Sequence, residues 1–391
     1  FARNCFNQIK GFGEYGFPES HAASFAILVY VSSWLKCRHP DVFACSLLNA
    51  QPMGFYAPAQ IVRDAIDHGV DVRPIDVNAS TWDNLLEPGP VASTRLHTRH
   101  REMVDDVKST YAMRLGFRQA QGLREEEMNR LVANRGAGYD SVRDVWLRGD
   151  VSQSTIERLA DADAFRSLGL DRREALWAAR GLNRVGDQDD LPLFGQGAAP
   201  AQARDFNLPP MRVGEHVVED YRTLRLSLKT HPVALLRPAL QARRVTPSQA
   251  LSAIPDGRHV RVCGLVLVRQ RPGTASGVIF MTLEDETHVA NIVVWPKTFE
   301  RYRPEVLGAR LCAVDGKVQS ERGVIHVIAQ RLWDYSPLLA GLSSETLDPP
   351  LANADEVRKP GNDVRQHPRH VRQDLSYETI EHVMPKGRNF H

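Results

Sequence analysis

Five short runs rich in valine and isoleucine follow one another between residues 257 and 335, and they strongly restrict how this part of the chain can fold. The runs are Val260–Val268, Gly277–Leu283, Ala290–Trp295, Ala309–Val318 and Val324–Trp333. The turn-forming pair Pro272-Gly273 separates the first two runs, and Asp315-Gly316 interrupts the fourth. Because β-branched residues favour strands, this spacing predicts a five-stranded OB β-barrel over residues 251–336.

The predicted barrel has a basic excess that suits single-stranded DNA. Residues 257–335 contain 11 Lys and Arg against 8 Asp and Glu, which gives +3. Cations can neutralise phosphates, and exposed aromatic rings can stack on bases. The residues expected to bind DNA here are Arg269, Arg271, Lys297, Phe299, Arg301, Tyr302, Arg303 and Lys317. Trp295 is expected in the core, and the alternative is a barrel whose aromatic residues only pack.

Residues 96–185 have the pattern of two short helical pairs, a tandem helix-hairpin-helix domain. The first turn contains Gly122, Leu123 and Arg124, where backbone N–H groups could bind a DNA phosphate. The second turn carries Asp163, whose charge would repel a phosphate. The alternative for each pair is a packing module without DNA contact, which we favour for the second.

A glycine-rich loop near the start leads directly into an apolar segment, Ala22–Leu35, expected to be a helix buried on most sides. Ser20 stands where an N-cap belongs, and His21 in the first turn could donate to a phosphate oxygen. The alternative is a tight turn over a core helix. The segment is shorter than the ~20 residues that cross a bilayer.

The run Gly13–Phe25 (GEYGFPESHAASF), followed by Trp34-Leu35-Lys36 and His39-Pro40, resembles the fingers segment of bacterial C-family DNA polymerases, the family of the DNA polymerase III alpha subunit. The end of the chain, Lys386–His391 (KGRNFH), resembles the error-prone, damage-tolerant mutasome branch of that family. The resemblance covers nearly the whole chain in order. It implies a multidomain α+β fold with five parts, namely the C-terminal part of mostly helical fingers (1–95), tandem helix-hairpin-helix (96–185), a linker with helices (186–250), the OB barrel (251–336) and a tail (337–391).

The resemblance further implies the C-terminal region of an error-prone DNA-directed DNA polymerase, a cytoplasmic nucleotidyltransferase acting in translesion synthesis, induced mutagenesis, DNA repair and replication. In the family, palm aspartates hold two Mg²⁺ ions. We expect those aspartates upstream of Phe1, so no catalytic residue, metal or cofactor is assigned to this chain. Ser20 and His21 are expected near the incoming nucleotide or primer phosphates. The alternative is a non-enzymatic DNA-binding or scaffold module of a repair assembly.

A short apolar peptide in the linker suggests a protein partner. It resembles the bacterial sliding-clamp motif through Gln188, Leu191, Leu193 and Phe194, although Asp190 occupies the usual glutamine position. The alternatives are clamp contact through a partner subunit, or packing on the chain's own surface. The expected partners are primer-template DNA, single-stranded DNA, a sliding clamp and mutasome accessory proteins, with no membrane.

Composition adds little to these expectations. The net charge of +2 provides no overall attraction to nucleic acid, so binding must come from local patches. The five cysteines form no Cys-x-x-Cys pair, which indicates neither a zinc site nor a disulfide framework.

Overall fold

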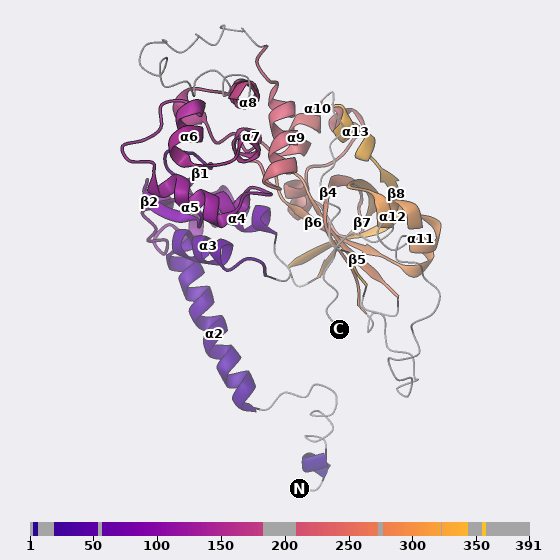
Figure 1. Ribbon diagram of the computed structural model, residues 1–391. Helices are drawn as coiled ribbons and strands as arrows, with labels where there is room; N and C mark the ends of the chain where they lie inside the picture. Colours follow the sequence, from indigo (N-terminus) through magenta and orange to yellow (C-terminus); the bar gives the residue numbers. More distant parts are fainter. Residues whose placement is uncertain are drawn as a thin grey trace, which may run out of the picture. The chain divides into compact units, whose positions relative to one another are not determined.

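The computed structural model describes residues 3–6, 19–53, 57–182, 209–272, 277–321, 323–342 and 354–356. The chain divides into two compact units, Phe1–Pro210 and Met211–His391. Figure 1 labels their helices and strands, and each unit is described by itself. The mixture of helical elements and a β-barrel confirms the predicted α+β class.

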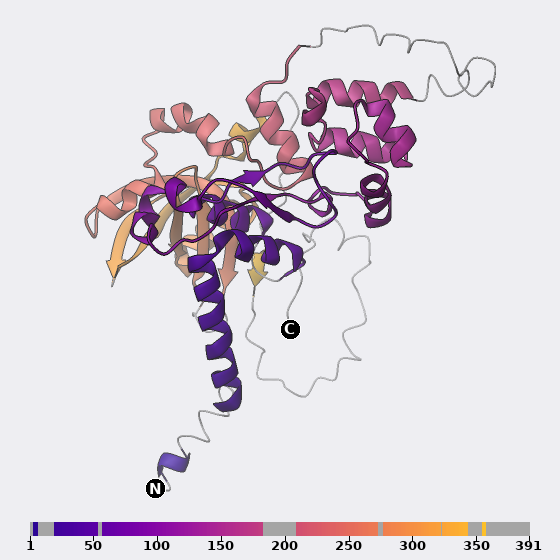
Figure 2. The same cartoon turned by 90° about the vertical axis from the view of Figure 1, so that its left-hand side faces the viewer.

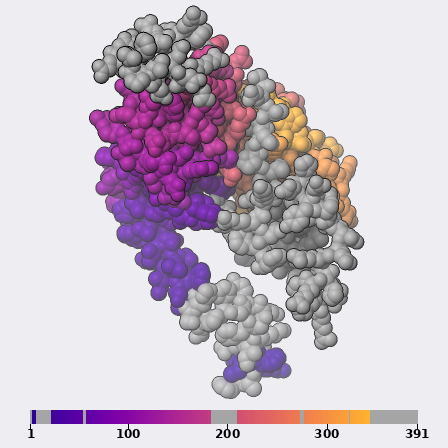
Figure 3. Space-filling view, in the orientation of Figure 1, coloured from indigo at the N-terminus to yellow at the C-terminus, as the bar shows by residue number. Residues whose placement is uncertain are grey.

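Unit 1 begins with three helices, α2 (Glu19–Arg38), α3 (Pro40–Asn49) and α4 (Pro58–Asp67). The prediction that the apolar helix is buried on most sides is wrong for this structure, since Ile27 is 65% exposed and Tyr30 is 72% exposed. Figures 1 and 2 show why, because α2 projects away from the rest of unit 1 and only its C-terminal end meets α3. The helix is also visible as the indigo rod in Figure 3.

A small sheet follows, with strands β1 (Val72–Arg73), β2 (Leu85–Pro88) and β3 (Tyr111–Arg114) in the order β1-β3-β2. The 3-10 turns η1 (Ala92–Arg95) and η2 (Thr98–Met103) lie between β2 and β3. The buried carboxylate of Asp41 in α3 accepts hydrogen bonds from the Ser109 hydroxyl and from the backbone N–H of Tyr111. These bonds attach the first turn of α3 to the start of β3.

The second half of unit 1 is a helical module. Its elements are η3 (Phe117–Gln119), α5 (Glu125–Ala133), α6 (Val142–Gly149), α7 (Gln153–Asp161), η4 (Arg166–Leu168) and α8 (Arg172–Gly181). Apolar side chains recur at helical spacing, and their buried members form the core, including Met128, Leu131, Ile156, Leu159 and Phe165. Figure 1 shows α5, α6, α7 and α8 grouped together.

Unit 2 contains the predicted barrel. Its strands are β4 (His259–Arg271), β5 (Ile279–Glu284), β6 (Val289–Val294), β7 (Leu311–Glu321) and β8 (Val324–Asp334). They pair in the order β5-β6-β8-β7-β4, and a further β4–β5 pairing closes the barrel. Only β6 and β8 of these five run parallel. This closed five-stranded arrangement is that of an OB fold, as predicted.

Short helices α11 (Pro296–Arg301) and α12 (Arg303–Gly308) connect β6 to β7, and α13 (Ser336–Ala340) follows β8. A three-residue strand, β9 (Ala354–Glu356), pairs in parallel with the end of β4. Gly316 lies at a bulge in β7, where a Cβ would come within 2.4 Å of the Ile328 carbonyl oxygen. Glycine is required there because the two strands approach so closely.

Helices α9 (Val213–Thr223) and α10 (Pro232–Ala242) were expected with the linker, but they pack on the barrel. Val218, Leu236 and Leu240 form a second apolar cluster with Cys263 and Leu311 of the barrel strands. An ionic contact reinforces this packing, because the Arg237 guanidinium donates to Asp285 and Glu286 in the β5–β6 turn. The helices are therefore an integral part of unit 2.

Several sequence-based expectations fall outside the described residues. These are the glycine-rich loop before α2, the clamp-like peptide with Gln188, Leu191, Leu193 and Phe194, and nearly all of the tail. Among the helices that are described, none has both the length and the apolar character needed to cross a membrane.

Candidate nucleic-acid interface

The loop between α5 and α6 carries the sequence Gly136-Ala137-Gly138, a glycine-x-glycine turn between two helices. Gly136 has φ +56° and Gly138 has φ +127°, which are backbone conformations that favour glycine. Ser141 then caps α6 by accepting a hydrogen bond from the backbone N–H of Asp144 at 3.1 Å. The layout helix, glycine turn, helix is that of a phosphate-binding hairpin.

Arg148 of α6 holds the carbonyl groups of this turn. Its guanidinium donates to the carbonyl oxygen of Gly138 at 2.7 Å and to that of Arg135 at 3.3 Å. It also lies 4.7 Å from the centroid of the Tyr139 ring and pairs with Asp144 at 2.7 Å. With these carbonyls bound to Arg148, the turn can present N–H groups to a ligand.

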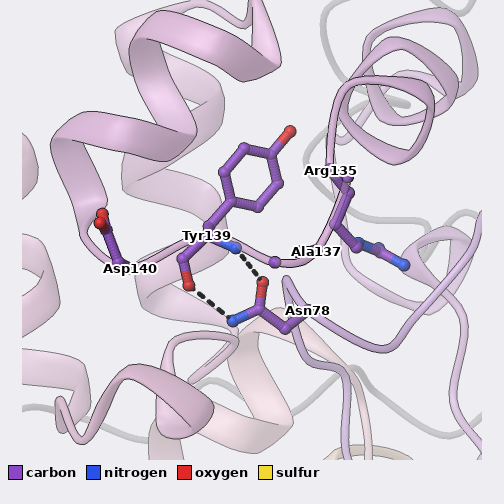
Figure 4. A pocket seen from close by; sticks show the side chains of 7 residues that line it. Asn78, Arg135, Ala137, Tyr139 and Asp140 are labelled. Atoms are coloured by element: carbon purple, nitrogen blue, oxygen red, sulfur yellow. Dashed lines mark hydrogen bonds between the residues drawn. The ribbon is translucent and has the colours of Figure 1, made fainter.

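The backbone N–H groups of Gly136 and Ala137 make no hydrogen bond within the described part of the chain. Both residues are exposed. They line a pocket of about 360 Å³ together with Asn78, Arg135, Gly138, Tyr139 and Asp140, shown in Figure 4. Two open N–H groups on a turn can donate hydrogen bonds to a phosphate oxygen.

Charges of both signs surround the turn. Arg135 donates to the Ser80 carbonyl oxygen, while its buried Nε has no partner among the described residues. Burial lowers the pKa of the Arg135 guanidinium from its ordinary value, although arginine stays charged in proteins. Asp140 is exposed in the same pocket and opposes an anion. Phosphate recognition here would therefore depend mainly on the backbone.

Gly122, Leu123 and Arg124, the residues predicted for the first hairpin turn, do not lie between two α-helices in this structure. Only a single 3-10 turn precedes these residues, Leu123 is buried, and the Gly122 carbonyl oxygen accepts from Arg158. Arg124 is exposed, but Glu125, Glu126 and Glu127 follow it in the first turn of α5. Three carboxylates at a helix start would repel a phosphate. The Gly-x-Gly at residues 136–138, which does lie between two α-helices, was not among the sequence-based predictions.

The α7–α8 turn has a different character. Asp163 has φ +60° and its carboxylate accepts from Arg166 at 2.9 Å. The backbone N–H groups of Asp163, Ala164 and Gly169 already bond to carbonyl oxygens within the turn. This agrees with the favoured interpretation of the second pair as a packing module.

A second candidate surface lies on the outer face of the barrel. Strand register places five residues in one row across the sheet, Phe280, Val293, Ile328, Lys317 and His259. Phe280 is 37% exposed and Lys317 is exposed. Trp295, two residues beyond Val293, is 53% exposed, so the prediction that it is core is wrong. The row offers rings for stacking and a cation for phosphate.

Two of the predicted barrel contacts are structural. Arg269 is 4% exposed, and its guanidinium donates to the carbonyl oxygens of Val306 and Ala309, which holds the end of α12. Phe299 is 9% exposed and belongs to the barrel core. Neither side chain is free to contact DNA in this structure.

The other predicted contacts lie mostly on α11 and α12. Lys297, Arg301 and Arg303 are exposed, and Tyr302 packs partly against the core. The guanidinium of Arg271 lies 5.5 Å from the centroid of the Phe299 ring. Of the eight predicted contacts, only Lys317 is on the row of outer-face residues.

The remaining site predictions have little structural context. The backbones of Ser20 and His21 lie in the first turn of α2, which begins at Glu19. No group of three or more His, Cys, Asp or Glu side chains that could hold a metal ion occurs in the residues described. The described parts therefore offer no metal centre through which a chemical step could be derived.

Two sequence profiles of known families match the chain. One, described as a helix-hairpin-helix motif, matches residues 69–175 and so includes the α5–α6 turn. The other, described as an OB-fold nucleic acid binding domain, matches residues 260–335 and thus the five strands. Both matches agree with the folds seen in the two units.

Whole proteins that resemble the chain carry one name. "Error-prone DNA polymerase 1" of Rhizobium meliloti (strain 1021) is 53% identical over 406 residues, covering 100% of this chain and 36% of that protein. "Error-prone DNA polymerase" of Ruegeria pomeroyi is 50% identical over 393 residues, covering 100% of this chain and 33% of that protein. The chain thus spans about a third of the length of these relatives.

Two solved structures each resemble about a fifth of the chain. Asparaginyl-tRNA synthetase from Pyrococcus horikoshii is 27% identical with a TM-score of 0.17, over 20% of each chain. The S. pombe Stn1-ten1 complex is 20% identical with a TM-score of 0.18, over 20% of this chain and 57% of that one. These likenesses are too limited to support an argument.

Proposed function

This chain is homologous over its whole length to a part of the bacterial error-prone DNA polymerases, and we propose that it forms the DNA-binding portion of such an enzyme. The observation that carries the proposal is the α5–α6 turn, with two open backbone N–H groups and carbonyls bound by Arg148. A turn of this kind binds the DNA backbone without reading sequence, which suits a polymerase that must move along any template.

A charge introduced at the turn tests this proposal. Ala137→Glu places a carboxylate beside the two N–H groups at an exposed position, so folding should be unaffected. The affinity for a blunt duplex should fall about tenfold, since each hydrogen bond to a charged group is worth about 1.5–3 kcal/mol. Fluorescence anisotropy of the 391-residue chain measures it.

Ser154→Glu is the matched control, because this exposed position follows the opposite end of α6. The control should bind the duplex as tightly as the unaltered chain. Equal affinities for Ala137→Glu and Ser154→Glu would show that the turn does not contact DNA.

We further propose that the outer face of the barrel binds single-stranded DNA through Phe280, Trp295 and Lys317. A ring that stacks on a base contributes about 1–3 kcal/mol, so Phe280→Ala should weaken oligo-dT binding five-fold or more. Lys317→Ala should reduce the salt slope by about 0.7, the value for one phosphate on a single strand.

Lys297→Ala is the comparison for Lys317→Ala, because both lysines are exposed but Lys297 lies on α11 rather than on the row. An unchanged slope for Lys297→Ala supports the strand face. A reduced slope for Lys297→Ala alone would instead favour the α11–α12 residues Arg301, Tyr302 and Arg303 as the DNA track.

For the whole protein we propose primer extension by nucleotidyl transfer during translesion synthesis, in the cytoplasm where the DNA lies. Ser20 and His21 would lie near the incoming nucleotide, so His21→Ala should slow nucleotide use in the full-length enzyme without unfolding it. Leu193→Ala with Phe194→Ala should abolish any direct binding to a sliding clamp in calorimetric titration. Absence of clamp binding by the unaltered chain would mean that contact requires an accessory protein.

A further inference from the structure

The α5–α6 turn is held from outside its own helices by a side chain some sixty residues earlier in the sequence. Asn78 follows β1, and its amide faces the backbone of Tyr139 directly after the Gly-x-Gly (Figure 4). Its Oδ1 accepts from the Tyr139 N–H at 2.7 Å, and its Nδ2 donates to the Tyr139 carbonyl oxygen at 2.9 Å. The Asn78 amide thus forms hydrogen bonds with both the N–H group and the carbonyl group of Tyr139.

The same segment also holds the α7–α8 turn. The Nδ2 of Asn78 lies 3.1 Å from the Ser167 hydroxyl, and the neighbouring Val77 N–H donates to the Ala164 carbonyl oxygen at 2.9 Å. The buried Asp76 carboxylate accepts from the N–H of Ser167 at 3.1 Å and from the N–H of Asn78 at 2.8 Å. Residues 76–78 therefore connect the two turns.

This arrangement decides where the open N–H groups point. Tyr139 is only one residue after Gly138, and glycine turns have many accessible conformations. Fixing both backbone groups of Tyr139 removes most of that freedom from the side of α6, while Arg148 fixes the carbonyls of Arg135 and Gly138. A preorganised turn loses less entropy when it binds a phosphate.

We propose that Asn78 is a positioning residue for phosphate binding by the α5–α6 turn. The inference rests on the proposed function of that turn. Asn78 need not touch DNA itself, because it acts through the backbone of Tyr139. Loss of its amide should leave the helices folded but allow the turn to move.

The test uses the 391-residue chain and a blunt DNA duplex at several salt concentrations. Asn78→Ala should weaken binding about tenfold and reduce the slope of log K against log salt by about 0.9, the value for one duplex phosphate. Ala137→Glu should reduce the slope in the same way. A general loss of stability would not change the number of phosphates bound, so the slope separates positioning from folding.

Asn84→Ala is the matched control. Asn84 lies in unit 1 and is buried, and its amide accepts from the Gly116 N–H at 2.9 Å and donates to Asn49 at 2.7 Å. It should lower the melting temperature to a similar extent but leave the salt slope unchanged. If Asn78→Ala does not fold, Asn78→Ser is measured in its place with the same expected fall in slope.

The outcomes distinguish the positioning role of Asn78 from the DNA contact of the turn. A normal slope for the Asn78 variant beside a reduced slope for Ala137→Glu overturns the positioning role alone. Normal slopes for both variants overturn the proposed DNA contact of the turn, and the role of Asn78 with it. Equal reductions for Asn78→Ala and Asn84→Ala also overturn the proposal, because the effect would then be general.

Discussion

Two turns of the same helical module, α5–α6 and α7–α8, satisfy their backbone groups in opposite ways. In the α5–α6 turn, side chains of Asn78 and Arg148 bind the backbone groups next to the glycines, and two N–H groups stay open. In the α7–α8 turn, N–H groups bond to carbonyls of the turn itself and Asp163 pairs with Arg166. Residues 76–78 support both turns, but the first keeps two N–H groups without a partner among the described residues, whereas the N–H groups of Asp163, Ala164 and Gly169 in the second are already bonded.

The comparison teaches that a glycine pattern alone does not make a phosphate site. Gly122 and Gly169 also have positive φ values, +80° and +75°, yet Gly122 follows a 3-10 turn rather than an α-helix, and the Gly169 N–H bonds to the Arg166 carbonyl oxygen. What distinguishes the α5–α6 turn is that it lies between two α-helices and has two N–H groups without a partner among the described residues. Four substitutions test this distinction.

The largest effect is expected from Gly138→Ala. With φ at +127°, alanine should cost about 1–3 kcal/mol of unfolding free energy even though its Cβ would meet Asn78 only at an ordinary 3.6 Å. Duplex affinity should fall as well. Denaturant unfolding and anisotropy measure the two effects.

Gly169→Ala in the α7–α8 turn provides the comparison, since Gly169 has positive φ and no neighbour within 4 Å. It should cost about 1–2 kcal/mol and leave DNA binding intact. A loss of DNA affinity in Gly169→Ala equal to that in Gly138→Ala would remove the difference between the turns.

A smaller effect is expected from Tyr139→Phe. The Tyr139 hydroxyl donates to the Leu131 carbonyl oxygen at 2.7 Å, and losing this bond should cost about 1 kcal/mol. Burial raises the pKa of Tyr139 above its ordinary 10.0, so the folded state keeps the proton longer than the unfolded state. Stability should be fully present below pH 10 and decline as pH rises through the folded pKa.

The decline above pH 10 should be weaker in Tyr139→Phe, which has no proton to lose at this position. Thermal melts from pH 8 to 11 measure it. Duplex affinity at pH 7 should not change, because the hydroxyl faces α5 rather than the open N–H groups. Identical alkaline profiles for both proteins would count against a role of Tyr139 ionisation.

The smallest effect is expected from Asp163→Gly. Glycine suits φ +60°, which should offset the lost ion pair with the half-exposed Arg166, leaving stability within about 1 kcal/mol. Duplex affinity should rise no more than about twofold, from the removed charge, because the N–H groups of this turn remain bonded. A tenfold gain would mean that Asp163 alone blocks a second phosphate site.

The barrel could be predicted because each strand corresponds to a short local run of strand-forming residues, and turn residues accompany these runs. The five runs match β4, β5, β6, β7 and β8 closely in their bounds. Which of its side chains are exposed could not be predicted in the same way. Arg269 and Phe299 have the right chemistry, but their burial depends on where α11 and α12 pack, which no local pattern reveals.

For the helical hairpins, too, some features were visible in the sequence and others were not. The Gly-x-Gly at residues 136–138 is visible in the sequence. The first hairpin turn was nevertheless predicted at Gly122, which precedes an amphipathic helix. The three glutamates after Arg124 were also visible in the sequence, and their negative charge is unfavourable for a phosphate at that turn. The apolar pattern of α2 by itself indicates burial, but the helix is exposed in the structure.

The sequence by itself determined where strands and helices form and where glycine permits a turn, because propensity, periodicity and turn chemistry act over a few neighbouring residues. Only the tertiary structure decided how the α5–α6 turn is held, because Asn78 reaches Tyr139 across some sixty residues of chain. It also decided which barrel side chains face outward, through strand register. Contacts between distant residues assign partners to polar groups, and the groups left without partners define the candidate site.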